Sequence, residues 1–340
     1  MVEPQSSKLI TRVRFPSSAP VRRPGDPSAD SGNVDAMCAT EPMPTRRLGP
    51  FEVSAIGLGA MPMSMGRDPQ PTQEQAIATI NAALDAGVTF IDTADIYAPS
   101  HAEMGHNERL VAAALAQRQK SGPPVVVGTK GGITRSTARG WGRNGSIEYL
   151  RRACEASCEA LGVDHIDLYQ WHRPDHHRAW VECVEALATL HQEGLITAVG
   201  ISNASSEQIE LAIDMLGTRS SGGLASVQNE FSPAHPWSRH ELELCAEHQV
   251  AFLPWSPLGG IRRAGGVDQH APVLTEIAAA HRVSPQQVTL AWELALGDHV
   301  IPIPGAGRPA SIIDSAAAAT LRLTKAEVDA LDEAIGGHRA

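Results

Sequence analysis

The stretch that decides the fold is Asp92-Thr93-Ala94-Asp95-Ile96-Tyr97, which directly follows the apolar run Gly87-Val88-Thr89-Phe90-Ile91. A short apolar run rich in β-branched residues is typical of a buried strand. Asp92 stands where this strand ends, and Tyr97 follows at the turn into the next segment. The pattern therefore predicts an acid and a phenol delivered together at the carboxyl end of a strand.

Two later strands are expected to end in the same way. The run 124–129 (PVVVGT) ends at Lys130, and the run 165–171 (HIDLYQW) ends at His172. A parallel barrel keeps its chemistry at the carboxyl ends of its strands, so these side chains should converge there. Four unrelated surface polar residues are the alternative, which the shared register makes the weaker interpretation.

An acid, a tyrosine, a lysine and a histidine together form a proton-donating site. A lysine cation favours the phenolate, so Lys130 should lower the pKa of Tyr97 from its ordinary value of about 10. Asp92 would supply the counter-charge of Lys130, and His172 would orient a carbonyl oxygen. Because the set contains no obvious nucleophile, the electrons are most simply supplied by a hydride cofactor.

The rest of the chain predicts an α/β fold of regular alternation from about residue 46. We expect a hairpin over 47–53 and core strands over 55–59, 89–92, 125–130, 166–172, 196–202, 225–230, 251–255 and 300–303. Helices are expected over 72–86, 106–117, 146–161, 178–193, 206–216, 238–248, 273–281, 285–296, 309–318 and from residue 324. Eight strand–helix units favour a (β/α)8 TIM barrel with an N-terminal hairpin and extra C-terminal helices over an open doubly wound sheet. The segment Gly57-Leu58-Gly59-Ala60-Met61-Pro62 lacks the third glycine of a dinucleotide fingerprint, which also favours the barrel.

Composition excludes several classes of function. The net charge of −10 argues against a nucleic-acid or anionic-membrane surface. No apolar run reaches the length of about 18 residues that a membrane helix needs. The cysteines are scattered without a C-x-x-C pair, which indicates reduced thiols, a cytoplasmic location and no metal site (Cys38, Cys154, Cys158, Cys183, Cys245). His172, His176 and His177 lie close in sequence, but exposed loop histidines explain the last two better than a zinc site does.

Residues 1–45 differ from the barrel domain expected over 46–340. They contain seven prolines and show no hydrophobic period. A proline-rich disordered extension and a start codon assigned too early both explain this segment, with Met37 or Met43 as a later start. A transit peptide is a further, weaker alternative.

The remaining strand ends suit a flat, amide-bearing, phosphorylated ligand. Ser202, Asn203 and Gln228 offer groups that could hydrogen-bond a carboxamide, and Trp255 offers a face on which a ring can stack. Glycines and Arg308 in the segment 303–308 (IPGAGR) precede a helix start, which is a reasonable phosphate site. Met61, Met63, Met65 and Trp141 could line a substrate pocket, and packing is an equally good interpretation of the methionines.

Taken together, these segments resemble the aldo-keto reductases from about residue 48 to the C-terminus. The resemblance rests on motifs at 57–59 (GLG), 92–97 (DTADIY), 105–108 (GHNE), 128–130 (GTK), 161–169 (LGVDHIDLY), 200–203 (GISN), 227–233 (VQNEFSP), 255–258 (WSPL) and 303–305 (IPG). It implies a tetrad of Asp92, Tyr97, Lys130 and His172, in which Tyr97 protonates a carbonyl while NADPH delivers hydride. The cofactor-binding residues that it implies are Ser202, Asn203, Gln228, Trp255, Ser256, Leu258, Gly305, Arg308, Ser311, Asp314 and Ser315.

One departure from the family affects the choice of cofactor. Many members have Arg-x-x-Glu-Asn where this chain has Ser311-Ile312-Ile313-Asp314-Ser315. Arg308 is then the cation of this loop, and Asp314 would repel a phosphate placed close to it. We therefore expect a modest preference for NADPH, with NADH also possible.

Three functions are compatible with this sequence. The leading hypothesis is NADPH-dependent reduction of an aldehyde or ketone to an alcohol, by an enzyme with a small-molecule carbonyl substrate and no nucleic-acid or membrane partner. A non-catalytic NADP(H)-binding regulatory subunit is the second. A Schiff-base aldolase that uses Lys130 is the third, although Asp92 nearby would favour a charged lysine over a free amine. The sequence identifies neither the carbonyl substrate nor the oligomeric state.

Overall fold

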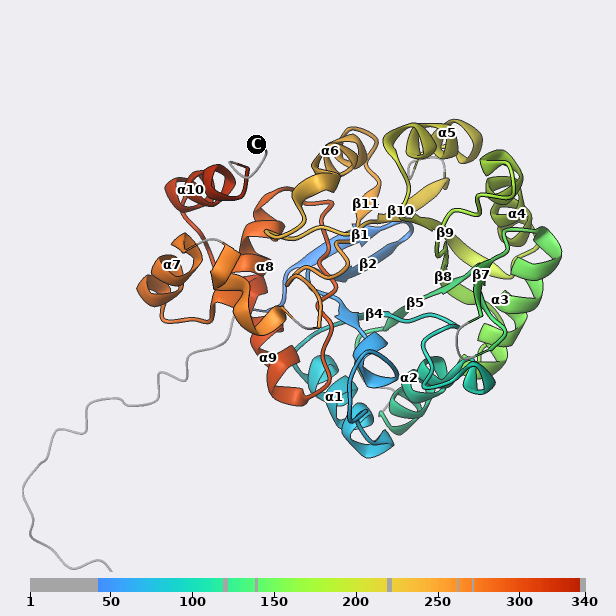
Figure 1. Ribbon diagram of the computed structural model, residues 1–340, viewed down its shortest axis with the longest axis horizontal. Helices are drawn as coiled ribbons and strands as arrows, with labels where there is room; N and C mark the ends of the chain where they lie inside the picture. Colours follow the sequence, from blue (N-terminus) through green and yellow to red (C-terminus); the bar gives the residue numbers. More distant parts are fainter. Residues whose placement is uncertain are drawn as a thin grey trace, which may run out of the picture. The chain divides into compact units, whose positions relative to one another are not determined.

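The computed structural model describes residues 42–118, 122–137, 140–218, 222–261, 263–270 and 272–336, without the side chains of 268–270 (Figure 1). The interpretation of residues 1–45 therefore lies outside the described residues, except for its last four. Among the described residues, no helix is both long enough and apolar enough to cross a membrane.

The core is a parallel sheet of seven strands in the order β11-β10-β9-β8-β5-β4-β3. The strands are β3 (Leu58–Gly59), β4 (Phe90–Asp92), β5 (Val126–Gly131), β8 (Ile166–Trp171), β9 (Ile196–Ser202), β10 (Leu224–Gln228) and β11 (Ala251–Phe252). All neighbouring pairs are parallel, as strict strand–helix alternation requires. The first and seventh strands are shorter than the sequence predicts.

An eighth segment, residues 299–305, closes the barrel between β11 and β3. The backbone N–H groups of Ile301 and Ile303 donate to carbonyls on the β11 side, while the carbonyls of Pro302 and Pro304 accept from Gly57 and Gly59 on the β3 side. A strand was predicted over 300–303, but the two prolines have no N–H to donate toward β3, so only half of a parallel ladder forms. The predicted (β/α)8 barrel is confirmed, with an irregular eighth strand.

Helices surround this sheet (Figure 1). After successive strands come α1 (Gln73–Asp85), α2 (His106–Gln117), α3 (Ile147–Leu161), α4 (Trp180–Gln192), α5 (Ser206–Leu216) and α6 (Arg239–Glu247). The C-terminal helices are α7 (Val273–His281), α8 (Pro285–Ala295), α9 (Pro309–Ala317) and α10 (Lys325–Gly336). Thr72 and Ser205 form the reciprocal side-chain and backbone bonds of a capping box, which fixes where α1 and α5 begin.

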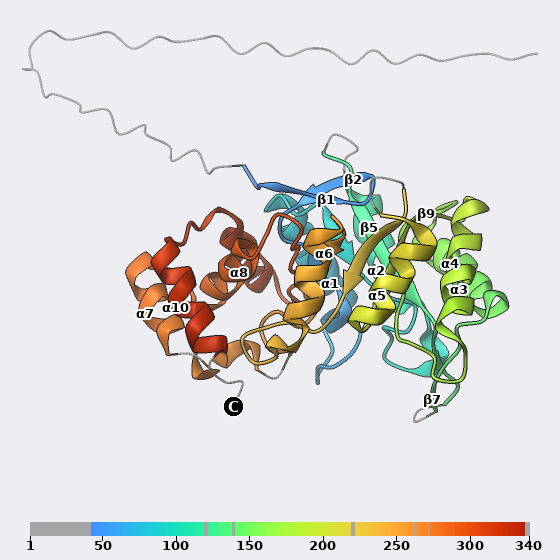
Figure 2. The same ribbon diagram turned by 90° about the horizontal axis from the view of Figure 1, so that it is seen from above.

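Two hairpins lie at opposite ends of the barrel (Figure 2). The predicted one pairs β1 (Thr45–Leu48) with β2 (Phe51–Ser54), and its Leu48 and Val53 side chains pack into the barrel interior. The other pairs β6 (Ile133–Arg135) with β7 (Trp141–Arg143) and was not predicted, because the segment 131–145 is rich in glycine and lacks the alternation of a strand.

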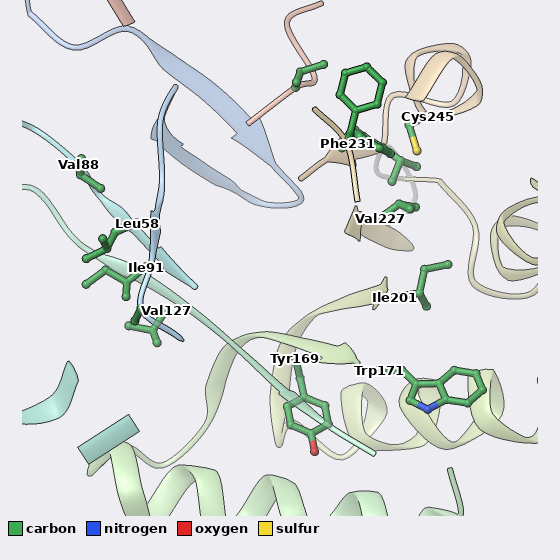
Figure 3. Packing of buried hydrophobic residues seen from close by; sticks show 14 of the residues in the cluster. Leu58, Val88, Ile91, Val127, Tyr169, Trp171, Ile201, Val227, Phe231 and Cys245 are labelled. Atoms are coloured by element: carbon green, nitrogen blue, oxygen red, sulfur yellow. The ribbon is translucent and has the colours of Figure 1, made fainter. Parts of the chain in front are cut away.

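Side chains alternate between the two faces of the sheet, so each strand contributes to two apolar layers. Phe90, Val126 and Leu168 point into the barrel, where they pack with Ala198, Ile301 and Ile303. Their neighbours along the chain, Ile91, Val127 and Tyr169, belong instead to the layer between the sheet and the helices (Figure 3). Tyr169 is directed toward the neighbouring helix, where its hydroxyl donates to the carbonyl of Leu150 at 3.4 Å. The inward positions that follow along each strand therefore face the mouth of the barrel.

Candidate active site

Three members of the predicted tetrad, Asp92, Lys130 and His172, continue these inward positions. Asp92 lies two residues after Phe90, Lys130 four residues after Val126, and His172 four residues after Leu168. Tyr97 comes from the loop after β4, whose backbone is tied to β5 by the Asp95 N–H donating to the Lys130 carbonyl at 3.2 Å. The period of two along the strands thus brings together Asp92, Lys130 and His172, and the loop after β4 adds Tyr97.

Lys130 is the centre of this cluster. Its Nζ lies 2.6 Å from Asp92 Oδ2 and donates to the carbonyl of Thr93 at 2.8 Å. It also donates to the hydroxyl of Tyr97 at 3.4 Å. The Lys130 side chain has no exposed surface and that of Asp92 has almost none, so this ion pair lies in a medium of low dielectric constant.

The charge states follow from burial and from these contacts. Burial lowers the pKa of Lys130, but Asp92 and Tyr97 outweigh that effect, so its pKa lies above the ordinary value and the lysine is charged. For Tyr97 the sequence-based expectation of a lowered pKa is wrong: burial raises the pKa of its hydroxyl more than the Lys130 charge lowers it. The resting site therefore holds a neutral phenol beside an ammonium group.

The second oxygen of Asp92 is held by amide side chains. Gln228 Nε2 donates to Asp92 Oδ1 at 2.8 Å, and Gln170 Nε2 donates to it at 3.2 Å. Gly200 leaves room for Gln170, because a Cβ at that position would lie 2.7 Å from Gln170 Cγ. The resemblance assigns Gln228 to a carboxamide, whereas here its nitrogen supports Asp92. Gln170 was not identified from the sequence, because its role depends on the register between strands.

His172 lines the same cavity as Tyr97. Its ring meets that of Tyr97 edge to face, with centroids 5.6 Å apart. Burial lowers the pKa of His172 well below its ordinary value, and the charges of Lys130 and Arg173 lower it further. The imidazole is therefore neutral, and its buried Nδ1 has no hydrogen-bond partner among the described residues.

The first turn of α2 hydrogen-bonds the residues next to Asp92 and Lys130. Asn107 accepts from the Thr93 hydroxyl at 2.6 Å and donates to the Ala60 carbonyl and the Ser64 hydroxyl. Glu108 accepts from the hydroxyl of Thr129, also at 2.6 Å. Thr93 follows Asp92 and Thr129 precedes Lys130, so α2 fixes both strand ends. The motif 105–108 was quoted from the sequence only as family evidence, and these supporting contacts were not foreseen.

A cavity of roughly 280 Å³ opens beside Tyr97 and His172. Of the predicted cofactor residues, seven line it: Ser202, Asn203, Gln228, Trp255, Ser256, Leu258 and Gly305. Asn203 and Ser256 have left-handed backbones with φ of 59° and 54°, at the turns where the chain leaves its strands. Met61, Met65 and Trp141 also line the cavity, while Met63 is packed in the core.

The other four predicted cofactor residues lie on or beside α9, outside the cavity lining. Arg308 is the exposed N-cap residue of this helix, and its side chain makes no capping bond in the described helix. Its Nε donates to Ser311 Oγ at 2.9 Å. Asp314 accepts from Ser284 and Gln287 at 2.7 and 2.6 Å. The Asp314 carboxylate is therefore held at the start of α8, and its effect on a phosphate stays a prediction. Ser315 is buried in the helix.

Two further arginines line the cavity and were missed from the sequence. Arg67, in the loop after β3, has an exposed side chain that lies against Gly307, where a Cβ would be 2.7 Å from its Nε. Arg173 follows His172 directly. Arg173 directly follows a strand-end motif, and that proximity is the signal that could have identified it; Arg67 lies eight residues beyond Gly59 and has no such signal.

These features fit a nicotinamide dinucleotide. The indole of Trp255 offers a stacking face, and Ser202 and Asn203 offer polar groups beside it. Gly305 presents exposed backbone to the cavity, Arg67 supplies a cation against Gly307, and Arg308 supplies another at the next position in the chain. Bare backbone at a helix start together with cations is the donor set that a phosphate needs.

Other chemistries find little support in the described part of the chain. No three His, Cys, Asp or Glu side chains there lie so as to hold a metal ion. Cys154, Cys158, Cys183 and Cys245 are free and buried, and burial raises the pKa of each thiol. Thiols that stay protonated are poor nucleophiles.

Comparisons with known sequences show the family to which the chain is related. A model of the aldo/keto reductase family matches residues 55–335. A probable aldo-keto reductase of Glycine max is 31% identical over 315 residues, covering 84% of this chain and 86% of the relative. A 6-dehydroglucose reductase of Novosphingobium aromaticivorans is 33% identical over 275 residues, covering 79% and 88%.

Solved structures give the same result. An aldo/keto reductase from Klebsiella pneumoniae, in complex with NADP and acetate, is 28% identical with a TM-score of 0.68, covering 85% of this chain and 94% of its own. A glycerol dehydrogenase from Gluconobacter oxydans is 26% identical with a TM-score of 0.69, covering 87% and 96%.

Proposed function

Because this chain belongs to the aldo/keto reductase family of oxidoreductases, we propose that it reduces an aldehyde or ketone to the alcohol with NADPH, and that Tyr97 donates the proton. The observation that carries the proposal is the Tyr97 hydroxyl, 3.4 Å from the ammonium of Lys130 and at the wall of the cavity. The likeness to a Klebsiella pneumoniae enzyme solved with NADP supports the choice of cofactor.

Different residues around the cavity would bind different parts of the cofactor. Trp255 would stack on the nicotinamide, Ser202 and Asn203 would hold its amide, and Arg67 and Arg308 would neutralise the phosphates. When bound, NADPH supplies the hydride that adds to the carbonyl carbon.

Tyr97 completes the reaction at oxygen. As negative charge develops on the carbonyl oxygen, the proton moves from the Tyr97 hydroxyl to that oxygen and gives the alcohol. The raised pKa ensures that the proton is present before reaction. Lys130 then stabilises the phenolate that remains, and a proton from solvent restores the phenol.

His172 orients the substrate rather than titrating. A neutral imidazole carries one N–H, which can donate to the carbonyl oxygen without competing for the proton of Tyr97. Burial of the site removes competing water, which strengthens the hydrogen bonds that His172 and Tyr97 would make to the carbonyl oxygen.

The two alternative functions are less well supported. A Schiff-base aldolase needs a free amine, whereas Lys130 is buried, charged and bonded to Asp92, Thr93 and Tyr97. A non-catalytic regulatory subunit would have no use for the ordered proton donor and its supporting contacts. The regulatory subunit would use the same cofactor site as the reductase, and the aldolase would use the same lysine. An assay of turnover is therefore needed to separate the three functions.

A panel of aldehydes and ketones assayed with NADPH tests the proposal. We expect NADPH oxidation that depends on the carbonyl compound and stoichiometric formation of the alcohol. Tight NADPH binding with no turnover across the panel would favour the regulatory subunit. Trapping of a substrate on Lys130 by borohydride would favour the aldolase.

A further inference from the structure

The cavity contains a cation that the proposed reaction does not use. Arg173 follows His172 and lines the same cavity as Tyr97. Its guanidinium carbon lies 5.9 Å from the ring centroid of Trp255, at the outer limit of a cation–π contact. The side chain is half-buried, so this cation is partly removed from water without a strong partner.

Two other arginines of this region hydrogen-bond backbone carbonyls, whereas among the described residues Arg173 does not. Arg135 donates to the carbonyls of Ala98 and Pro99, and its guanidinium stacks on Trp141. Arg143 donates to the carbonyl of Pro174 at 2.8 Å. In the described part of the chain, the guanidinium of Arg173 makes no hydrogen bond and no ion pair.

The acids close to Arg173 are already occupied. Asp175 accepts from the backbone N–H groups of Gly145 and His177 at 3.1 and 3.0 Å. Asp92 is neutralised by Lys130. Neither carboxylate forms an ion pair with Arg173 in the described part of the chain, so its guanidinium is available to an anion that enters the cavity.

The second cavity cation lies elsewhere. Arg67 rests against Gly307, beside the helix start that suits the cofactor phosphates. Arg173 instead stands next to His172, the residue placed to meet the carbonyl. Its guanidinium lies near Trp255, the residue proposed to stack on the nicotinamide, so an anion bound there would lie at the end of the cavity where the carbonyl reacts and away from the phosphates beside Arg67.

We propose that Arg173 selects carbonyl substrates that carry a carboxylate, binding that group while the carbonyl oxygen faces Tyr97 and His172. A guanidinium presents two parallel N–H groups that match a carboxylate, and it stays charged at any pH the enzyme meets. Apolar side chains such as Ile96 and Ile133 line the same cavity and would cover the carbon skeleton between the two groups. This inference rests on the proposed function for its turnover assay.

The test compares para-formylbenzoate with its methyl ester, which have the same ring and aldehyde but differ in charge. The wild type should have a kcat/KM at least about tenfold higher for the carboxylate, as expected for a bidentate charged contact. Arg173→Met should reduce this ratio to near one by slowing the carboxylate, while the ester rate, the Kd of NADPH and the Tm change little. Arg67→Met is the matched control: it should weaken NADPH and leave the ratio unchanged.

Two results would overturn the inference. One is a ratio that Arg173→Met does not alter. The other is an equal loss for both substrates together with weaker NADPH binding, which would place Arg173 on the cofactor.

A binding assay separates this inference from the proposed function. The alcohol product para-hydroxymethylbenzoate and its methyl ester are titrated against the NADP+-loaded protein, using tryptophan fluorescence from the cavity residues Trp255 and Trp141. Carboxylate binding that Arg173→Met abolishes supports the inference even if no carbonyl is turned over. Equal binding of the two compounds contradicts it whatever the turnover.

Discussion

The ammonium of Lys130 lies 2.6 Å from the carboxylate of Asp92, and both side chains are buried. A buried ion pair contributes little net stability, but removal of one partner leaves an uncompensated buried charge. Asp92 thus keeps Lys130 charged beside Tyr97, and the amides of Gln228 and Gln170 hold Asp92 in place.

Asp92→Asn should therefore be strongly destabilising. We expect the free energy of unfolding to fall by about 3–5 kcal/mol, the usual cost of breaking a buried pair. The double variant Asp92→Asn/Lys130→Met should lose less than the sum of the two single variants, because it leaves no lone charge. Denaturant unfolding of the four proteins measures this coupling, and strict additivity would show that the pair is not coupled in solution.

His172 should not titrate near neutral pH. Its pKa is lowered well below the ordinary value of about 6.5, so the ring stays neutral as pH falls through that value. The pH profile of kcat/KM should then lack an inflection there. A step near that pH which His172→Gln removes would mean that the imidazole is charged during turnover.

Arg308 should favour NADPH over NADH. Its guanidinium stands at the start of α9, beside the Ser311 hydroxyl. Arg308→Ala should weaken NADPH binding by about 1.5–3 kcal/mol, the range for hydrogen bonds to a charged group, and barely change NADH binding. Fluorescence titration gives both dissociation constants, and equal losses for the two cofactors would show that Arg308 does not contact the 2′-phosphate.

Glu293 should make stability depend on pH. It is fully buried in α8, its two oxygens have no partner among the described residues, and burial raises its pKa well above the ordinary value. The folded state then holds a proton that the unfolded state loses above about pH 4.3, so stability falls as pH rises through the window between the two pKa values.

Glu293→Gln isolates this effect. In that window the free energy of unfolding of the wild type should fall relative to that of the variant by about 1.4 kcal/mol per pH unit. Unfolding measured in urea over a pH series provides the comparison. A constant difference between the two proteins would indicate that Glu293 is ionised, or solvated, in the folded state.

Much of this molecule follows from its sequence. Strand ends such as those at Asp92, Lys130 and His172 are local patterns, and the period of two then fixes which side chains face the barrel mouth. Contacts that depend on the register between strands are not local, so the support of Asp92 by Gln170 was missed. The eighth strand was over-predicted, because its apolar pattern conceals the missing N–H groups of Pro302 and Pro304. Burial likewise reversed the expected shift in the pKa of Tyr97, since a sequence shows which charge is near but not how dry the site is.

The most direct test of the central claim is a comparison of wild type with Tyr97→Phe. Both proteins are loaded with NADPH and mixed with an aldehyde that the wild type reduces, and the oxidation of NADPH is followed. The variant keeps the ring packing against His172 but loses the proton. We predict an unchanged Kd for NADPH and a rate lower by at least about 100-fold. A Tyr97→Phe protein that reduces the aldehyde at nearly the wild-type rate would contradict the assignment of Tyr97 as the proton donor.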